Sequence, residues 1–213
     1  MRTEDNLVLF GDFRENPEKY PLSTPSGKIE IFSETIESFG YDDCAGHPRW
    51  YEPDEWLGGP RASQFPLHLI ANQPKTRLHS QLDHGAASQA SKIQGREPIR
   101  MHPDAAAARG VSAGDVVRVF NDRGACLAGV IVDSDLRSDV VQLSTGAWYD
   151  PLDPADPDSL CVHGNPNVLT PDIGTSSLSH GCTGQHVLVQ IEKFDGGALP
   201  PVKAFDPPVL RSR

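Results

Sequence analysis

Three loops of this chain concentrate side chains that could bind a polar ligand. The first covers residues 71–81 and places amides, a guanidinium, an imidazole and a hydroxyl within a few positions, directly after an apolar run that predicts a strand. Such a set can hydrogen-bond a polar heterocycle and its phosphate. A solvated polar loop that binds nothing accounts for the same composition equally well.

The other two loops lie nearer the C-terminus. In residues 161–172, Asn165-Pro166-Asn167 follows Gly164 and predicts a tight loop that presents side-chain amides and backbone N–H groups. Residues 174–185 are rich in Gly, Ser and Thr and end at Gln185, a composition that suits phosphate or ribose. Alone, the third loop is a weak signal, because most loops of this kind bind no ligand.

Catalytic motifs are missing from these loops. The sequence has no Gly-rich phosphate loop, no dinucleotide fingerprint and no pair of carboxylates suited to acid–base work. The residues from Gly174 to Leu178 lack the closing glycine of a nucleophile elbow. A small hydrolase that uses His79 with Ser80 or Ser176 is therefore disfavoured. We predict a binding function with no catalytic residue and no metal ligand in this chain.

The four cysteines also fit no metal motif. Cys44, Cys126, Cys161 and Cys182 form no C-x-x-C pair and have no histidine at zinc-finger spacing. We interpret them as ordinary thiols in a reducing compartment.

Composition limits the class of protein further. The chain has 213 residues, of which 38% are hydrophobic and 23% charged, and its formal net charge is -10. An acidic chain of this kind disfavours a nucleic-acid partner. No apolar run has the length of a membrane helix, and the first six residues do not resemble a signal peptide.

The elements that position the loops are mostly short strands. Strands are predicted at 65–70, 116–120, 126–132, 140–143 and 187–191, with a hairpin turn at 121–124. One helix is predicted over 101–110, with Pro103 at its start and Gly110 at its end. Short strands separated by long polar loops predict a closed barrel with loop insertions.

The barrel is expected to be flanked by two irregular segments. In the N-terminal one we expect a turn at 24–27, a short strand at 28–32 and a short helix capped by Ser33. Residues 195–213 are a Pro-rich tail that either docks or is disordered.

Several motifs occur in an order that resembles the dimethyl sulfoxide reductase family of molybdenum oxidoreductases. They lie at residues 24–35, 72–74, 77–81, 103–106, 109–119 and 164–170. The resemblance extends over nearly the whole chain and is greatest for biotin sulfoxide and trimethylamine-N-oxide reductases.

The resemblance implies a mainly β fold with short helices. Residues 61–194 would form a double-psi β-barrel that binds a molybdopterin dinucleotide, and residues 1–60 an irregular extension that closes the preceding domain. The family's cofactor is molybdenum held by two molybdopterin guanine dinucleotides (bis-MGD). Carried over residue by residue, the cofactor contacts would be Asn72, Gln73, Arg77, His79, Ser80, Gln81, Asn165, Asn167 and Gln185. Arg77 would give its forked donors to a pyrophosphate oxygen.

The resemblance also defines what this chain lacks. The family's molybdenum-ligating serine belongs to an earlier domain, so we expect the remaining domains of the reductase as partners and no activity from this chain alone. The complete enzyme would reduce an S-oxide or N-oxide by two electrons. The compartment is not fixed, with the cytoplasm slightly favoured over the periplasm. The alternative is a stand-alone β-barrel that binds another ligand or a protein partner.

Overall fold

The computed structural model describes residues 8–181 and 183–207. These residues fall into two compact units, one made of 8–52 with 176–180 and the other of the remaining described residues. Cys182, the first seven residues and the end of the predicted tail, 208–213, lie outside the described residues. We describe each unit separately.

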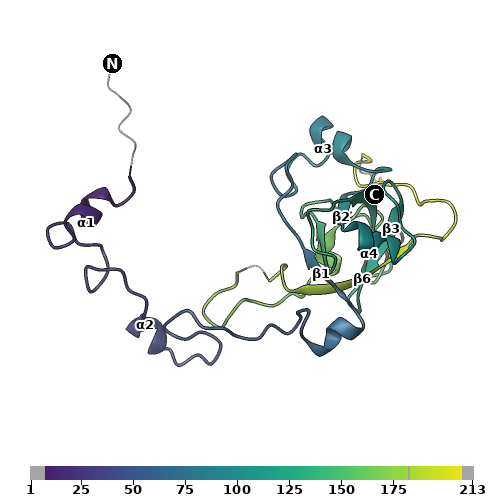
Figure 1. Cartoon of the computed structure of the whole chain (residues 1–213). Coiled ribbons are helices and arrows are strands. Elements are labelled where there is room, and N and C mark those ends of the chain that lie inside the picture. The colour runs from purple at the N-terminus through teal and green to yellow at the C-terminus, as the bar shows by residue number, and fades with distance from the viewer. Residues whose placement is uncertain (1–7, 182, 208–213) are drawn as a thin grey trace, which may run out of the picture. The chain divides into compact units, whose positions relative to one another are not determined.

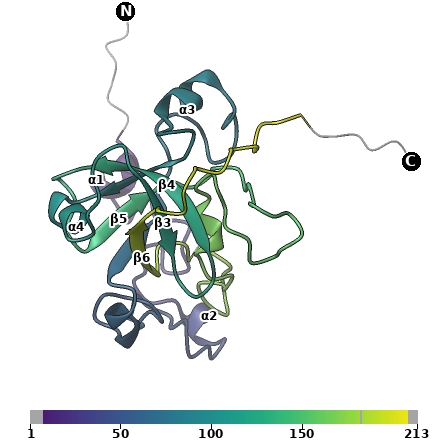
Figure 2. The same cartoon turned by 90° about the vertical axis from the view of Figure 1, so that its right-hand side faces the viewer.

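The larger unit is a closed barrel of six strands (Figures 1 and 2). The strands are β1 (Leu67–Ile70), β2 (Pro98–Met101), β3 (Val116–Phe120), β4 (Ala125–Val132), β5 (Val140–Leu143) and β6 (Val187–Lys193). Around the barrel they follow the order β1-β5-β2-β4-β3-β6. Its helical pieces are η1 (Pro60–Ser63), α3 (Ala86–Ser91), α4 (Pro103–Ala107) and η2 (Pro166–Val168). Among the described residues, no helix combines the length and apolarity needed to traverse a bilayer.

The pairing of the strands has an internal twofold pattern. β1 pairs with β5, and β2 with β4, in parallel, while all other neighbours are antiparallel. Exchanging β1, β2 and β3 for β4, β5 and β6 leaves every pair and every direction unchanged. This is the mixed closed barrel that the family resemblance implied, and it has no open sheet edge.

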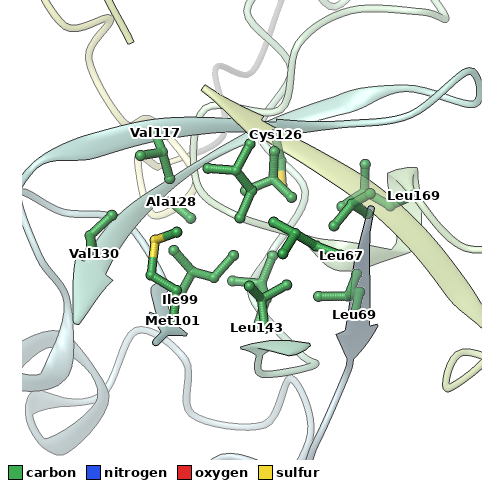
Figure 3. Close-up of a cluster of buried hydrophobic side chains, with 14 of the residues drawn as sticks. Leu67, Leu69, Ile99, Met101, Val117, Cys126, Ala128, Val130, Leu143 and Leu169 are labelled. Atoms are coloured by element: carbon green, nitrogen blue, oxygen red, sulfur yellow. The ribbon is translucent and has the colours of Figure 1, made fainter. Parts of the chain in front are cut away.

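The barrel interior is filled by side chains from all six strands. Figure 3 shows Leu67 and Leu69 from β1, Ile99 and Met101 from β2, and Leu143 from β5 in one cluster of buried side chains. Each of these residues is at most 2% exposed. The interior is therefore a packed core, and any ligand must bind outside it.

Most predicted elements of the barrel are confirmed. The five predicted strands correspond to β1, β3, β4, β5 and β6 to within a few residues. The helix α4 begins at Pro103 as predicted, and Gly110 after it has a left-handed φ of 63°. The strand β2 and the helix α3 were not predicted. The strand β2 is only four residues long, with a proline at its first position and an arginine on its outer face, so the signal in its sequence is weak.

The C-terminal tail docks on the barrel unit over its described part. Arg96 donates a hydrogen bond to the carbonyl of Pro200, and Asp150 accepts from the backbone N–H groups of Lys203 and Ala204. Phe205 packs edge-on against the His163 ring at 5.0 Å. Docking, one of the two predictions for this segment, is therefore observed up to residue 207.

The smaller unit contains little buried surface. Its helices are α1 (Gly11–Glu15) and α2 (Glu34–Glu37), and Ser33 caps α2 by accepting from the Ile36 N–H at 3.3 Å. The prediction of a strand at 28–32 is wrong, because this segment pairs with no strand among the described residues and leaves Ile29 and Ile31 72% and 77% exposed. Other exposed apolar side chains of the unit are Val8, Leu9, Phe10, Tyr20, Phe32, Phe39, Tyr41, Trp50 and Leu178.

Candidate functional site

Both long connections of the barrel emerge at the same end. The pairing registers place the C-terminal ends of β1 and β5 beside the N-terminal ends of β2 and β6. The connections 71–97 and 144–186 therefore start and finish at one rim, together with the β3–β4 hairpin at 121–124. All nine residues predicted to contact the ligand belong to these two connections. We call this end the loop rim.

Amide side chains tie the loops of the rim together. Asn72 accepts a hydrogen bond from Ser144 Oγ at 3.2 Å, which joins the ends of β1 and β5. Gln185 donates to the carbonyl of Ala71 at 3.0 Å, and Gln73 donates to the carbonyl of Arg77 at 2.8 Å. Asn72 also donates to the carbonyl of Gln73 at 2.9 Å, so the three amides already hold the first loop in shape.

The turn 78–82 presents three of the predicted contacts to the outside. His79, Ser80 and Gln81 are exposed, and their side chains form no hydrogen bond with any residue in the described ranges. The backbone beneath them is unusual, since His79 has a φ of 49° and Leu82 a φ of 58°. Exposed donors on a well-defined backbone are suited to contacting a ligand.

A glycine supports this turn from below. A Cβ on Gly146 would lie 1.9 Å from the carbonyl oxygen of His79, so only glycine allows the two segments to approach so closely. The φ of Gly146 is also left-handed, at +90°.

Arg77 is placed differently from the prediction. Its side chain has no exposed surface, and its Nε, Nη1 and Nη2 donate to the His79 carbonyl, Ser88 Oγ and the Thr145 carbonyl. It also forms ion pairs with two buried carboxylates, Asp83 and Glu97. The guanidinium therefore acts inside the protein in this structure, and a pyrophosphate contact would require it to leave these partners.

The second loop borders a separate hollow of about 550 Å³ at the same rim. Asn165 uses its Oδ1 to accept from the N–H of Asn167 at 2.9 Å, which starts η2. The Asn167 side chain is exposed and has no hydrogen-bond partner within the described ranges. Arg123 and Tyr149 also line the hollow, so it offers a guanidinium, an aromatic ring and amides to a ligand.

A second pocket, of about 210 Å³, lies beside the first loop. Besides Asn72 it is lined by Lys75, Thr76, Arg100 and Gln142. Arg100 was not among the predicted site residues, because it lies on β2, a strand that was not predicted. Lys75 lies in the first loop, and its charge next to two amides was a usable signal for an anion-binding group.

Buried charge beneath the loop rim was also missed. Burial raises the pKa of the Asp83 carboxyl, but hydrogen bonds from Lys92, the Trp148 N–H and Ser88 outweigh it, so the pKa lies below its usual value. Burial, and next the charge of Lys92, lower the pKa of His163. Asp83 is therefore charged at neutral pH and His163 is neutral. A sequence carries no periodic signal for isolated buried charges.

The geometry fits a domain that binds a polar ligand, since polar loops surround one end of a packed barrel. Among the described residues, no cluster of side chains could hold a metal ion. Comparison with known families agrees and is more specific. The family described as "Molydopterin dinucleotide binding domain" matches residues 67–188, and the chain belongs to this family.

Individual relatives are long reductases of which this chain matches a part. The chain is 49% identical over 203 residues to a dimethyl sulfoxide/trimethylamine N-oxide reductase of Cereibacter sphaeroides, covering 95% of this chain and 24% of the relative. It is 50% identical to trimethylamine-N-oxide reductase 1 of Escherichia coli K12, over 86% of this chain and 22% of the relative. It is 47% identical to a biotin sulfoxide reductase of Cereibacter sphaeroides, over 91% of this chain and 25% of the relative. The chain is thus homologous to the C-terminal part of such reductases and spans about a quarter of their length.

A solved structure supports the fold. Acetylene hydratase from Pelobacter acetylenicus matches with a TM-score of 0.65 and 20% identity, covering 84% of this chain and 25% of the hydratase chain. At this identity the likeness concerns the fold alone.

Proposed function

We propose that the loop rim binds one side of a molybdopterin guanine dinucleotide in a molybdenum-dependent S-oxide or N-oxide reductase. The observation that carries the proposal is that both connections bearing the nine candidate residues start and finish at one end of the barrel. Three of them, His79, Ser80 and Gln81, are exposed on one turn without protein partners for their side chains.

The side chains at the rim fit the chemistry of this cofactor. Imidazole and amide groups at His79, Gln81 and Asn167 match the donors and acceptors of a fused heterocycle. Lys75, together with Arg100 in the adjoining pocket, provides positive charge for phosphates. When bound, the molybdenum of the cofactor supplies the two-electron chemistry, and the residues of this chain bind and orient the nucleotide. Reductase activity then requires the other domains.

The smaller unit fits the role of a segment that completes another domain. Many of its apolar side chains are exposed, because the unit has almost no interior of its own in which to bury them. Exposed apolar surface on this scale is typical of an interface. Its partner in this proposal is the preceding part of the reductase.

Calorimetric titration of the 213-residue chain with metal-free molybdopterin guanine dinucleotide tests the proposal. We expect saturable binding that weakens when His79 and Gln81 are both replaced by alanine. Lack of binding by the wild-type chain, or equal binding by the double variant, would contradict it. Robust S-oxide or N-oxide reduction by this chain alone would overturn the expectation that it needs further domains. Saturable binding of a different class of ligand at the loop rim would favour the alternative, a stand-alone β-barrel that binds another ligand.

A further inference from the structure

Four buried charges form a closed ring beneath the loop rim. Arg77 Nε lies 3.3 Å from Asp83 Oδ1, which lies 2.7 Å from Lys92 Nζ. Lys92 Nζ lies 2.5 Å from Glu97 Oε2, which lies 3.1 Å from Arg77 Nη2. The four side chains are between 0% and 3% exposed. Positive and negative charges alternate around the ring, so it is neutral overall.

The ring lies within a single connection of the barrel. All four residues come from the segment between β1 and β2, and Lys92 directly follows α3. A buried ion pair is weak evidence for stability, because well-packed apolar residues of similar volume often do as well. What such charges provide is directionality, since each one fixes the position of its partners.

Hydrogen bonds lead from the ring to the backbone that carries the ligand-facing side chains. Arg77 donates from Nε to the carbonyl of His79 and from Nη2 to the carbonyl of Thr145, each at 3.0 Å. Asp83 accepts from the Trp148 N–H at 3.0 Å, and the indole N–H of Trp148 donates to the carbonyl of Ser80 at 2.8 Å. Both His79 and Ser80 are thus connected to the ring through their carbonyl oxygens.

The turn 78–82 needs such support. Two of its residues with side chains, His79 and Leu82, adopt left-handed backbone conformations that are unfavourable without it. The side chains of His79, Ser80 and Gln81 make no bonds to described residues that could hold the turn. Besides the backbone hydrogen bond from the Gln81 N–H to the Leu78 carbonyl at 2.9 Å, the constraint comes from the ring and from the contact with Gly146.

We infer that the ring Arg77–Asp83–Lys92–Glu97 is a positioning device, which fixes the turn 78–82 in its ligand-binding geometry before the ligand arrives. The inference rests on the proposed function and extends it from residues that touch the cofactor to residues that act through the backbone. Arg77 in particular positions the turn from inside the protein. Fixing the turn in advance improves affinity because less chain has to be ordered on binding.

The variant Lys92→Met tests the inference, because it removes one charge and keeps most of the side-chain volume. The matched control is Lys193→Met, which removes an exposed lysine paired with Asp115 at 2.9 Å. Two quantities are measured on the 213-residue chain. They are the affinity for metal-free molybdopterin guanine dinucleotide by calorimetry and the ¹⁵N order parameters of residues 78–82 by NMR.

We expect Lys92→Met to lose about 10- to 100-fold in affinity, by analogy with the loss found when residues that orient metal ligands are removed. The order parameters of residues 78–82 should fall while those of β3 and β4 stay unchanged. Lys193→Met should match the wild type in both measurements. Lys92→Arg, which keeps the charge, should recover most of the affinity that Lys92→Met loses. A merely structural role would lower stability and leave the order of the turn unaltered.

Wild-type affinity in Lys92→Met, or weaker binding with an unchanged turn, would overturn the inference. If Lys92→Met does not fold, Arg77→Lys takes its place, since it keeps the charge and removes the bonds to the carbonyls of His79 and Thr145. A wild-type chain that fails to bind the nucleotide would refute the proposed function. Comparing the order parameters of residues 78–82 between the wild type and Lys92→Met would then still show, without any ligand, whether the ring holds the turn.

Discussion

Replacing Gly146 by alanine tests how closely the turn 78–82 is packed on the segment that follows β5. A residue with a Cβ pays about 1–2 kcal/mol for left-handed backbone, and Gly146 has a φ of +90°. In addition, the new Cβ would lie 1.9 Å from the His79 carbonyl oxygen and 2.8 Å from the Ser80 nitrogen. Forcing this overlap apart costs about 1–3 kcal/mol. We therefore expect Gly146→Ala to lower the free energy of unfolding by about 2–5 kcal/mol.

The control is Gly114→Ala, which separates the two contributions. Gly114 has a φ of +86°, but a Cβ there would meet no atom within 4 Å. It should cost only the backbone contribution of about 1–2 kcal/mol. Urea denaturation followed by circular dichroism measures both losses, and calorimetry with metal-free molybdopterin guanine dinucleotide should show weaker binding for Gly146→Ala alone. Equal losses of stability for the two variants, with equal affinity, would refute this reasoning.

Three further predictions concern the structure around the loop rim. The pKa of His163 is lowered in the folded state, so on acidification the unfolded chain binds a proton before the folded chain does. The contribution of neutral His163 to the unfolding free energy is therefore fully present above the ordinary histidine pKa of about 6.5 and declines as the pH falls below it. His163→Phe should reduce this decline in the unfolding free energy, and an unchanged decline would contradict the assignment. Arg123→Ala should lower the free energy of unfolding by about 1–3 kcal/mol, since it removes two hydrogen bonds to the buried Glu55 carboxylate. A double-mutant cycle with Glu55→Gln should show an interaction energy between the two residues, and strictly additive losses would contradict this role. Truncation after Phe194 should lower the Tm, because it removes the docked tail with Phe205, and an unchanged Tm would show that the tail does not stabilise the barrel.

The barrel strands were predictable because alternation and turn chemistry are local signals. Val116–Phe120 and Ala125–Val132 flank an Asn-Asp-Arg-Gly turn, and the structure shows the expected hairpin. The strand Pro98–Met101 was missed because a four-residue segment with a proline and an arginine carries little local signal, and its place between β5 and β4 is set by tertiary pairing. The segment 28–32 shows the opposite error, since alternation alone cannot supply a partner strand.

The candidate site was predictable as a set of loops but not in its internal roles. Side-chain types in the connections 71–97 and 144–186 indicated a polar ligand, and the strand pairing brings these connections to one rim. The sequence could not distinguish Arg77, which is buried among carboxylates, from His79, which is exposed two residues later. Burial of a charge depends on partners such as Lys92 and Glu97, which only the folded chain brings together.

The end of the barrel at which the ligand binds is the most direct test of the proposed function. Titration of the ¹⁵N-labelled chain with metal-free molybdopterin guanine dinucleotide, followed by NMR chemical shifts, measures this residue by residue. We predict saturable shifts in residues 72–81, 144–149, 165–167 and 183–186, and none at the opposite end in residues 102–115 and 133–139. Shifts confined to that opposite end, or no saturable shifts at all, would contradict the account.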